Sequence, residues 1–160
     1  MNKTNKTNAM RLMDAAKIPY RAVEYEYDEN DLGGEHVAAV TGMNPDQVFK
    51  TLVARGEKKG ILVFCIPVSC TLDLKKAAHA AGDKKVEMIH MKELLPLTGY
   101  IRGGCSPVGM KKLFPTVIDA SAEDLETMIV SAGKIGYQVE LSPRDLAALV
   151  RAKFAELIAE

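Results

Sequence analysis

Lys50 has the most unusual setting of any charged residue in the sequence, because it lies in the middle of the apolar run VFKTLVA at 48–54. Alternate side chains of a strand point to opposite faces, so Lys50 would share a face with Val48 and Leu52. A buried ammonium without a partner costs free energy, so this lysine must pair, extend to the surface or line a cavity. Two interpretations stay open: a functional cation, and a lysine that protects an edge strand against aggregation.

The second candidate is the loop GGCSPVG at 103–109. Its glycines and proline predict a tight turn whose backbone N–H groups could hold a phosphate or a carbonyl oxygen. It is not a P-loop, because the G-K-[ST] ending is missing, and no G-x-G-x-x-G occurs. An ordinary tight turn is the alternative. Cys105 lies inside this loop with no histidine near it in sequence, which favours a small packed thiol over a nucleophile.

No other pattern predicts a conventional catalytic group or a bound metal. The three cysteines are odd in number and lack a C-x-x-C pair, and His36, His79 and His90 stand apart. We therefore expect neither a disulfide framework nor a metal site nor a cofactor. The small-residue run SAGK at 131–134 is typical of a hairpin turn, and the five tyrosines could stack on a nucleobase or simply pack.

Composition limits the class of protein. The chain has 160 residues, 21 basic and 21 acidic, with 48% hydrophobic and 26% charged residues, which excludes a disordered chain and fits one domain. No apolar run is long enough to span a membrane and the polar start is unlike a secretory signal, so we expect a cytoplasmic protein. The segment 75–112 carries eight basic and three acidic residues; it could meet an RNA or be a solvated surface.

The pattern of helices and strands predicts an α+β domain with a mixed sheet and flanking helices. Helices are expected at 8–16, at 35–40, at 72–81 and at 91–95, where Pro96 should end the fourth. Strands are expected at 20–27, 48–54, 61–67, 116–121, 128–133 and 137–141, the second and third forming a hairpin. A last helix begins after Ser142 as N-cap, and its apolar stripe continues to the end of the chain: Leu146, Leu149, Val150, Phe154, Leu157 and Ile158. Residues 1–7 are expected to form a flexible arm and 8–160 one domain.

Several short motifs occur together in one order and resemble a known family. They are FKTLV, LKKAA, KVEM, TGYIRGGCSPVGMKK, PTVID, VSAGKIG and VELSPRDL. In combination the chain resembles the YbaK/EbsC family of aminoacyl-tRNA deacylases, which is related to the editing domain inserted in some prolyl-tRNA synthetases. The match runs from the first predicted helix to the last, and it implies a mixed, partly barrel-like sheet with flanking helices.

The resemblance implies an enzyme that removes cysteine mischarged on tRNA(Pro), and also Cys-tRNA(Cys), with the substrate's own thiol attacking the ester. Because cysteine and proline are similar in size, an apolar pocket discriminates poorly between them and a second site is needed. The implied partners are the tRNA acceptor end and prolyl-tRNA synthetase, with no cofactor, no DNA and no membrane. Two alternatives stay open: a deacylase of the same family for another residue, such as Ala-tRNA(Pro), and a tRNA- or synthetase-binding module without turnover.

The resemblance also implies roles for individual residues. Lys50 matches the family's essential lysine, which would hold the terminal phosphate or ribose, while Gly104, with Gly103 and Ser106, matches the loop whose amides would hold the ester carbonyl. Tyr25 matches a tyrosine near the substrate. The small-residue wall of the pocket corresponds to Ser131 and Gly133. The chain departs from many relatives at Gln138, where some carry an acid, and at Cys105, where many carry an aliphatic residue.

Overall fold

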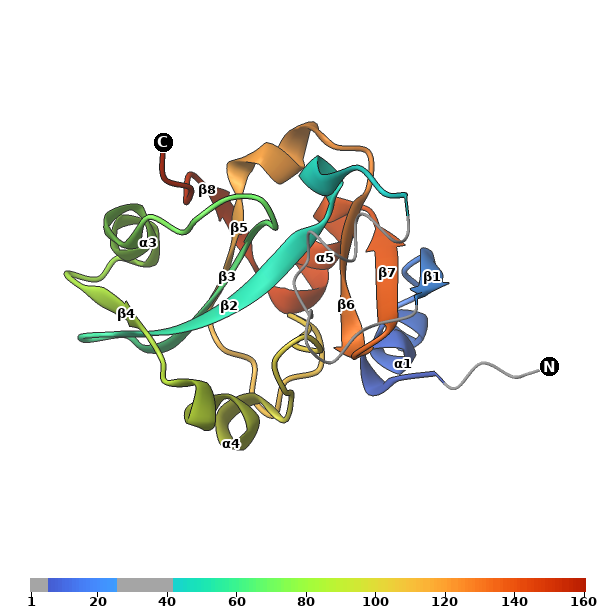
Figure 1. Ribbon diagram of the computed structural model, residues 1–160, viewed down its shortest axis with the longest axis horizontal. Coiled ribbons are helices and arrows are strands. Elements are labelled where there is room, and N and C mark those ends of the chain that lie inside the picture. The colour runs from blue at the N-terminus through green and yellow to red at the C-terminus, as the bar shows by residue number, and fades with distance from the viewer. Residues whose placement is uncertain (1–5, 26–41) are drawn as a thin grey trace.

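The β2–β3 hairpin is the centre of the fold. In the computed structural model, which describes residues 6–25 and 42–160, strand β2 (Phe49–Gly56) pairs antiparallel with β3 (Gly60–Pro67) (Figure 1). Most of β3 is buried, as its continuously apolar sequence predicts for a central strand. The predicted hairpin is therefore confirmed.

The hairpin belongs to a five-stranded mixed sheet with the order β4-β2-β3-β5-β8. Strand β4 (Val86–Met88) is antiparallel to β2, whereas β5 (Thr116–Asp119) and β8 (Lys153–Ala155) extend the other edge in parallel. The sequence analysis did not predict β4 and β8, each of which is three residues long and has its alternation obscured by charges.

A smaller antiparallel sheet has the order β1-β7-β6, with bounds β1 Tyr20–Glu24, β6 Met128–Lys134 and β7 Tyr137–Leu141. A parallel bridge between Val48 and Ile129 joins the two sheets. Figure 1 shows β2 leaning away from β6 beyond this point. The single mixed sheet of the prediction is thus two sheets that meet at one end, and the strands of the described residues close no barrel.

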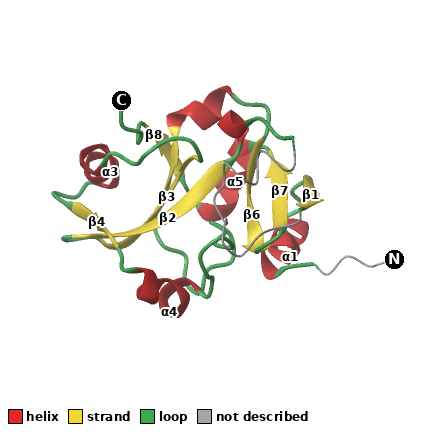
Figure 2. Ribbon diagram, in the orientation of Figure 1, coloured by secondary structure: helices red, strands yellow, loops and turns green. Residues whose placement is uncertain are grey.

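The helices begin at recognisable caps and lie outside the sheets (Figure 2). Thr7 caps α1 (Asn8–Ala15), Asp73 caps α3 (Leu74–Ala81) and Ser142 caps α5 (Pro143–Val150), each side chain accepting a backbone N–H of the first turn. The short elements are η1 (Pro45–Gln47), η2 (Met91–Glu93), α4 (Leu94–Thr98) and η3 (Ala120–Asp124). None of the helices among the described residues is long and apolar enough to cross a membrane.

The last helix is shorter than its apolar stripe predicts. It ends at Val150, Arg151 adopts a left-handed conformation with φ 57°, and the chain turns into β8. The exposed edge of β5 takes β8 as a parallel partner, and the buried carboxylate of Asp119 accepts the N–H of Leu157 at 2.9 Å. These long-range hydrogen bonds outweigh the local helical preference of residues 151–158.

Two smaller boundaries also differ from the prediction. Pro96 does not end its helix, because it lies in the first turn of α4, where its missing N–H has no partner to lose, and α4 continues to Thr98. The strand predicted at 116–121 ends at Asp119, whose side chain caps η3. The helix predicted at 35–40 and the end of the strand at 26–27 lie outside the described residues.

Two main clusters of buried residues stabilise these elements. The main core lies between α1, α5 and the sheets, and includes Phe49, Cys65, Ile118, Met128, Val130, Ala132, Val139, Leu141 and Leu146. The second core packs α3 onto the other face of the larger sheet through Phe64, Ile66, Ala77 and Leu157. In Figure 1 α5 lies behind both sheets, where the main core places it.

Candidate functional site

Lys50 lies on the face of β2 that is turned away from the main core. Phe49, its neighbour, is 3% exposed and belongs to that core. Because side chains alternate along a strand, Lys50 points to the opposite face, together with Val48. Lys50 is half-buried, and no ion pair joins it to a residue within 6–25 or 42–160.

Ser131 lies on the corresponding face of β6. Met128, Val130 and Ala132 belong to the main core, so Ile129 and Ser131 face the other way. The same register pairs Ser131 with Gln138 of β7 and Gln138 with Val23 of β1. The side chains of Ser131 and Gln138 therefore point away from the main core.

Lys50 and Ser131 lie on the same side of two strands that meet at one bridge. Val48 and Ile129 pack together with Val68 in a small buried cluster, at the point where β2 and β6 touch. Each of the two polar residues lies two positions further along its strand, on the same side of the molecule. The strands diverge from this contact (Figure 1). Lys50 is half-buried, and Ser131 is 8% exposed, with its Oγ accepting the N–H of Gly133 at 3.1 Å.

Tyr25 lies on the same side, at the end of β1. Its N–H donates to the carbonyl of Gly136 at 2.9 Å, which continues the ladder of the smaller sheet by one residue. It follows Val23 by two positions, so it shares the face of Gln138. The structure therefore brings three of the predicted site residues, Lys50, Ser131 and Tyr25, to one side, and their roles stay predictions.

The glycine loop packs against the end of β6. A Cβ at Gly104 would lie 3.1 Å from the backbone nitrogen of Ile135 and 3.4 Å from Lys134, and a Cβ at Gly133, whose φ is +98°, would lie 2.9 Å from the Tyr100 ring. Both glycines are therefore needed for a close approach between the loop and the turn that follows β6. The phenol of Tyr100 braces the loop by donating to the carbonyl of Val108 at 2.5 Å.

Gly104 and Ser106 make hydrogen bonds to residues in or next to the loop. The N–H of Gly104 donates to the carbonyl of Ile101 at 3.0 Å, and Ser106, fully buried, accepts the N–H of Val108 on its Oγ at 3.1 Å. The amides of Cys105 and Ser106 have no acceptor within the described part of the chain. A carbonyl bound by this loop would thus meet these two amides rather than that of Gly104, whose predicted role is untested.

The thiols near the loop are poor nucleophiles. Burial raises the pKa of the Cys105 thiol to about 12, against a smaller opposing effect of a hydrogen bond to Thr98, and burial likewise raises the pKa of Cys65 to about 12. Both thiols are therefore protonated at neutral pH. This agrees with the interpretation of Cys105 as a packed thiol.

Sequence reasoning missed two features of the site. Tyr100 appeared only as one of five tyrosines, yet its ring fixes the loop against Gly133, and burial raises the pKa of its phenol to about 12. Gln138 appeared only as a departure from relatives, yet it is 7% exposed and its Oε1 lacks a hydrogen-bond partner among the described residues. Neither feature has a local sequence signal, because both depend on contacts between distant segments.

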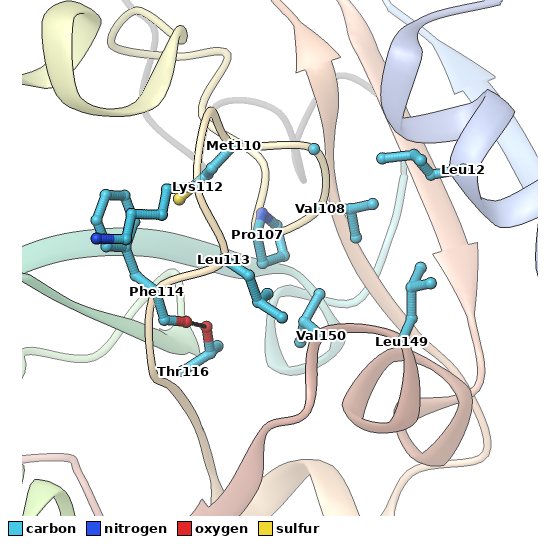
Figure 3. Close-up of a pocket in the computed structure, with 11 residues that line it drawn as sticks. Leu12, Pro107, Val108, Met110, Lys112, Leu113, Phe114, Thr116, Leu149 and Val150 are labelled. Carbon is cyan, nitrogen blue, oxygen red and sulfur yellow. Dashed lines mark hydrogen bonds between the residues drawn. The ribbon is translucent and has the colours of Figure 1, made fainter.

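A cavity of about 220 Å³ lies on the core side of the loop and includes none of the predicted site residues. Leu12, Val108, Leu113 and Val150 line it, and Figure 3 shows the last three directed toward one another. The cavity lies between the loop and α5, because residues of both line it, and Lys50 is not among its lining residues.

Comparison with known proteins identifies the family. Residues 33–149 match the family model described as "Aminoacyl-tRNA editing domain". The chain belongs to this family. The editing domain is 50% identical, over 152 residues, to a protein of Enterococcus faecalis named "Putative Cys-tRNA(Pro)/Cys-tRNA(Cys) deacylase EbsC", which covers 95% of this chain and 93% of that protein. The resemblance to the YbaK/EbsC family is thereby confirmed.

Solved structures share the fold of this editing domain. One, named "Crystal structure of a putative trans-editing enzyme for prolyl tRNA synthetase", is similar with a TM-score of 0.79 at 24% identity, covering 98% of this chain and 100% of that one. Another, named "Crystal structure of hypothetical protein APE2540", has a TM-score of 0.84 at 23% identity and covers 93% and 97%. The predicted α+β fold of a single domain is confirmed by these likenesses.

Proposed function

We propose that this editing domain removes cysteine from mischarged tRNA(Pro), and also from Cys-tRNA(Cys), by cleaving the aminoacyl ester. The observation that carries the proposal is the placement of Lys50 and Ser131 on the same side of β2 and β6, with a glycine loop packed against the end of β6. The 50% identity to a protein named as a deacylase of these two tRNAs supports the choice of substrate.

The substrate supplies the nucleophile in this reaction. The cysteine thiol attacks its own carbonyl carbon, a C–S bond forms, and the bond from that carbon to the ribose oxygen breaks. The ribose oxygen takes the proton that the thiol loses, so the products are a cysteine thiolactone and a tRNA with a free terminal hydroxyl. Cys65 and Cys105, both protonated at neutral pH, are not required as nucleophiles.

The protein would contribute position and charge. The Lys50 ammonium holds the terminal phosphate or ribose of the tRNA, so that the ester lies near the glycine loop. The amides of Cys105 and Ser106 in the glycine loop hold the carbonyl oxygen as negative charge develops on it. Tyr25 contacts the substrate from the end of β1, and Ser131 with Gly133 forms the wall that limits the size of the amino acid.

The proposal implies a tRNA partner and a cytoplasmic site of action, because charged tRNAs are made and used there. Prolyl-tRNA synthetase is the second partner, from which the domain receives mischarged tRNA either directly or after release. A second, hydrolytic site would be needed because a synthetase pocket that admits proline discriminates against cysteine by only about 1–3 kcal/mol per methylene-sized difference.

The test is deacylation of purified Cys-tRNA(Pro) and Ala-tRNA(Pro) by the wild-type protein, with the released product identified. We expect fast release of a thiolactone from the cysteine ester and a rate near the uncatalysed one for alanine, which lacks a thiol. Fast release of alanine would instead support the alternative deacylase. Tight tRNA binding with no cleavage of either ester would contradict the enzyme and support a binding module.

A further inference from the structure

Four exposed cations surround the glycine loop, and we call them the basic rim: Arg102, Lys111, Lys112 and Lys134. Three are in the loop and its continuation, and the fourth is at the end of β6. The sequence from 94 to 118 contains no Asp or Glu. None of the four forms an ion pair with a residue in the described part of the chain.

The packing of the loop brings these cations to one edge of the molecule. Arg102 lies two residues before Gly104 in the sequence. A Cβ at Gly104 would lie 3.4 Å from the backbone of Lys134. The N–H of Lys111 donates to the carbonyl of Thr98 at 3.1 Å, so the continuation of the loop returns to its start. The rim therefore contains residues from two segments about thirty residues apart in the sequence. It lies at the end of β6, the strand that also carries Ser131.

A second group of four lysines provides the contrast: Lys58, Lys59, Lys84 and Lys85, which we call the distal knuckle. Three acids accompany it, namely Glu57, Asp83 and Glu87. The carboxylate of Asp83 is at its centre and accepts the N–H groups of Lys58, Lys59 and Lys84 at 3.0, 2.8 and 2.7 Å. The knuckle lies at the far end of the β2–β3 hairpin from Lys50. The two groups have equal numbers of cations. In the knuckle acidic residues lie among them, whereas no residue of the described part of the chain forms an ion pair with a cation of the rim.

We propose that the basic rim binds successive phosphates of the RNA strand whose 3′ end lies beside Lys50. The inference rests on the proposed function for the identity of the RNA, and it adds the surface by which that RNA is held. A polyphosphate strand fits this rim because exposed Lys and Arg side chains bind phosphates as point charges and by bidentate hydrogen bonds, and each bound phosphate releases condensed counterions. Such binding positions the strand without reading its sequence.

The first experiment measures the affinity of the full chain for uncharged tRNA(Pro) between about 50 and 300 mM salt. The variants are a rim quadruple, Arg102→Ala with Lys111→Ala, Lys112→Ala and Lys134→Ala, and a knuckle quadruple that changes Lys58, Lys59, Lys84 and Lys85 to Ala.

The two variants should differ in their dependence on salt. Each phosphate that the protein neutralises adds about 0.7–0.9 to the steepness of log K against log salt. We expect the rim variant to neutralise about two to four phosphates fewer than the wild type and to bind at least ~10-fold more weakly at low salt. For the knuckle variant we expect the affinity to fall by a factor smaller than ~3. Circular dichroism checks that both variants fold.

The second experiment compares two esters, Cys-tRNA(Pro) and a cysteinyl ester of a short CCA fragment. The rim variant should lose far more of kcat/KM on the full tRNA than on the fragment, because the fragment carries few phosphates. Equal salt slopes for the rim variant, the knuckle variant and the wild type would overturn the inference. Failure of the wild type to cleave either ester would overturn the proposed function instead, while a rim-dependent salt slope would still support the rim.

Discussion

Phe49 and Lys50 are adjacent in the sequence but face two regions of very different character. Phe49 points into the main core, where side chains from α1, α5 and both sheets leave 3% or less of most residues exposed. Lys50 points away from this core, and so does Ser131, whose neighbour Val130 is fully buried in it. The same pair of strands thus builds one face that packs into the core and stabilises the fold, and an opposite face that carries Lys50 and Ser131.

This difference shows why the two faces should respond differently to substitution. A buried apolar side chain contributes through transfer from water and close packing, so its removal costs stability. A half-buried lysine without an ion-pair partner in the described part of the chain contributes little to stability. The comparison predicts that stability and activity can be lost separately at positions one residue apart.

The largest expected effect is that of Phe49→Ala. Truncation of a fully packed aromatic side chain costs about 3–5 kcal/mol of unfolding free energy, since a cavity remains in the core. Urea denaturation followed by circular dichroism measures the loss. Residual folded protein should still cleave Cys-tRNA(Pro), because the opposite face is unchanged. A loss below ~1 kcal/mol would mean that the two faces do not differ as the packing indicates.

Lys50→Ala should reverse this pattern. We expect deacylation of Cys-tRNA(Pro) to fall by about 10²-fold or more, the usual effect of removing one preorganised charged or hydrogen-bonding group. The free energy of unfolding should change by less than ~0.5 kcal/mol, as for other surface substitutions. Lys50→Arg is the matched control, which keeps the charge and should keep part of the activity. Equal rates for wild type and Lys50→Ala would remove Lys50 from the proposed mechanism.

Gly133→Ala tests the contact between the turn that follows β6 and the Tyr100 ring, which braces the glycine loop. The substitution meets both a positive φ of +98° and the Tyr100 ring at 2.9 Å, so we expect a loss of about 2–3 kcal/mol. Gly60→Ala is the control, because Gly60 also has a positive φ, +77°, but nothing lies within 4 Å of the added Cβ. Its loss should be nearer ~1 kcal/mol. Equal losses would show that Tyr100 does not constrain this turn.

Gln138→Leu should stabilise the protein, in contrast to the other substitutions. The Oε1 of Gln138 is buried without a partner in the described residues, and replacing such a group by an apolar one of similar shape removes a cost of about 1 kcal/mol or more. Gln47→Leu is the matched control, since Gln47 donates to Thr127 twice, at 3.1 and 3.2 Å, and its loss should destabilise. Thermal unfolding of the two variants should therefore shift in opposite directions.

Cys105→Ala has the smallest expected effect. Because burial raises the pKa of this thiol to about 12, almost no thiolate is present at neutral pH and the side chain acts only by packing. Deacylation should fall by less than ~3-fold, and iodoacetamide at neutral pH should not inactivate the wild type through this residue. A loss as large as that of Lys50→Ala would identify a protein nucleophile and contradict attack by the substrate thiol.

The amino-acid sequence by itself determined the elements whose signals are local. The hairpin at 48–67 follows from two apolar runs around a polar turn, and most of α3 follows from the helical pattern that ends at Gly82, although the helix begins after its Asp73 cap, two residues later than the predicted Leu72. The motifs also gave the family, because their order along the chain is itself a property of the sequence. Lys50 was also recognisable from the sequence, because a charged residue in the middle of an apolar strand is a local feature.

Only the tertiary structure decided the end of α5 and the assembly of the site. Residues 151–158 have a helical pattern, yet the edge of β5 and the carboxylate of Asp119 hold them as β8 and a short extended segment. The placement of Lys50 and Ser131 on the same side of the molecule depends on the bridge between Val48 and Ile129, which joins positions 81 residues apart. Local spacing cannot encode such pairings, because the free energy that selects them comes from backbone groups and side chains that meet only after the chain has folded.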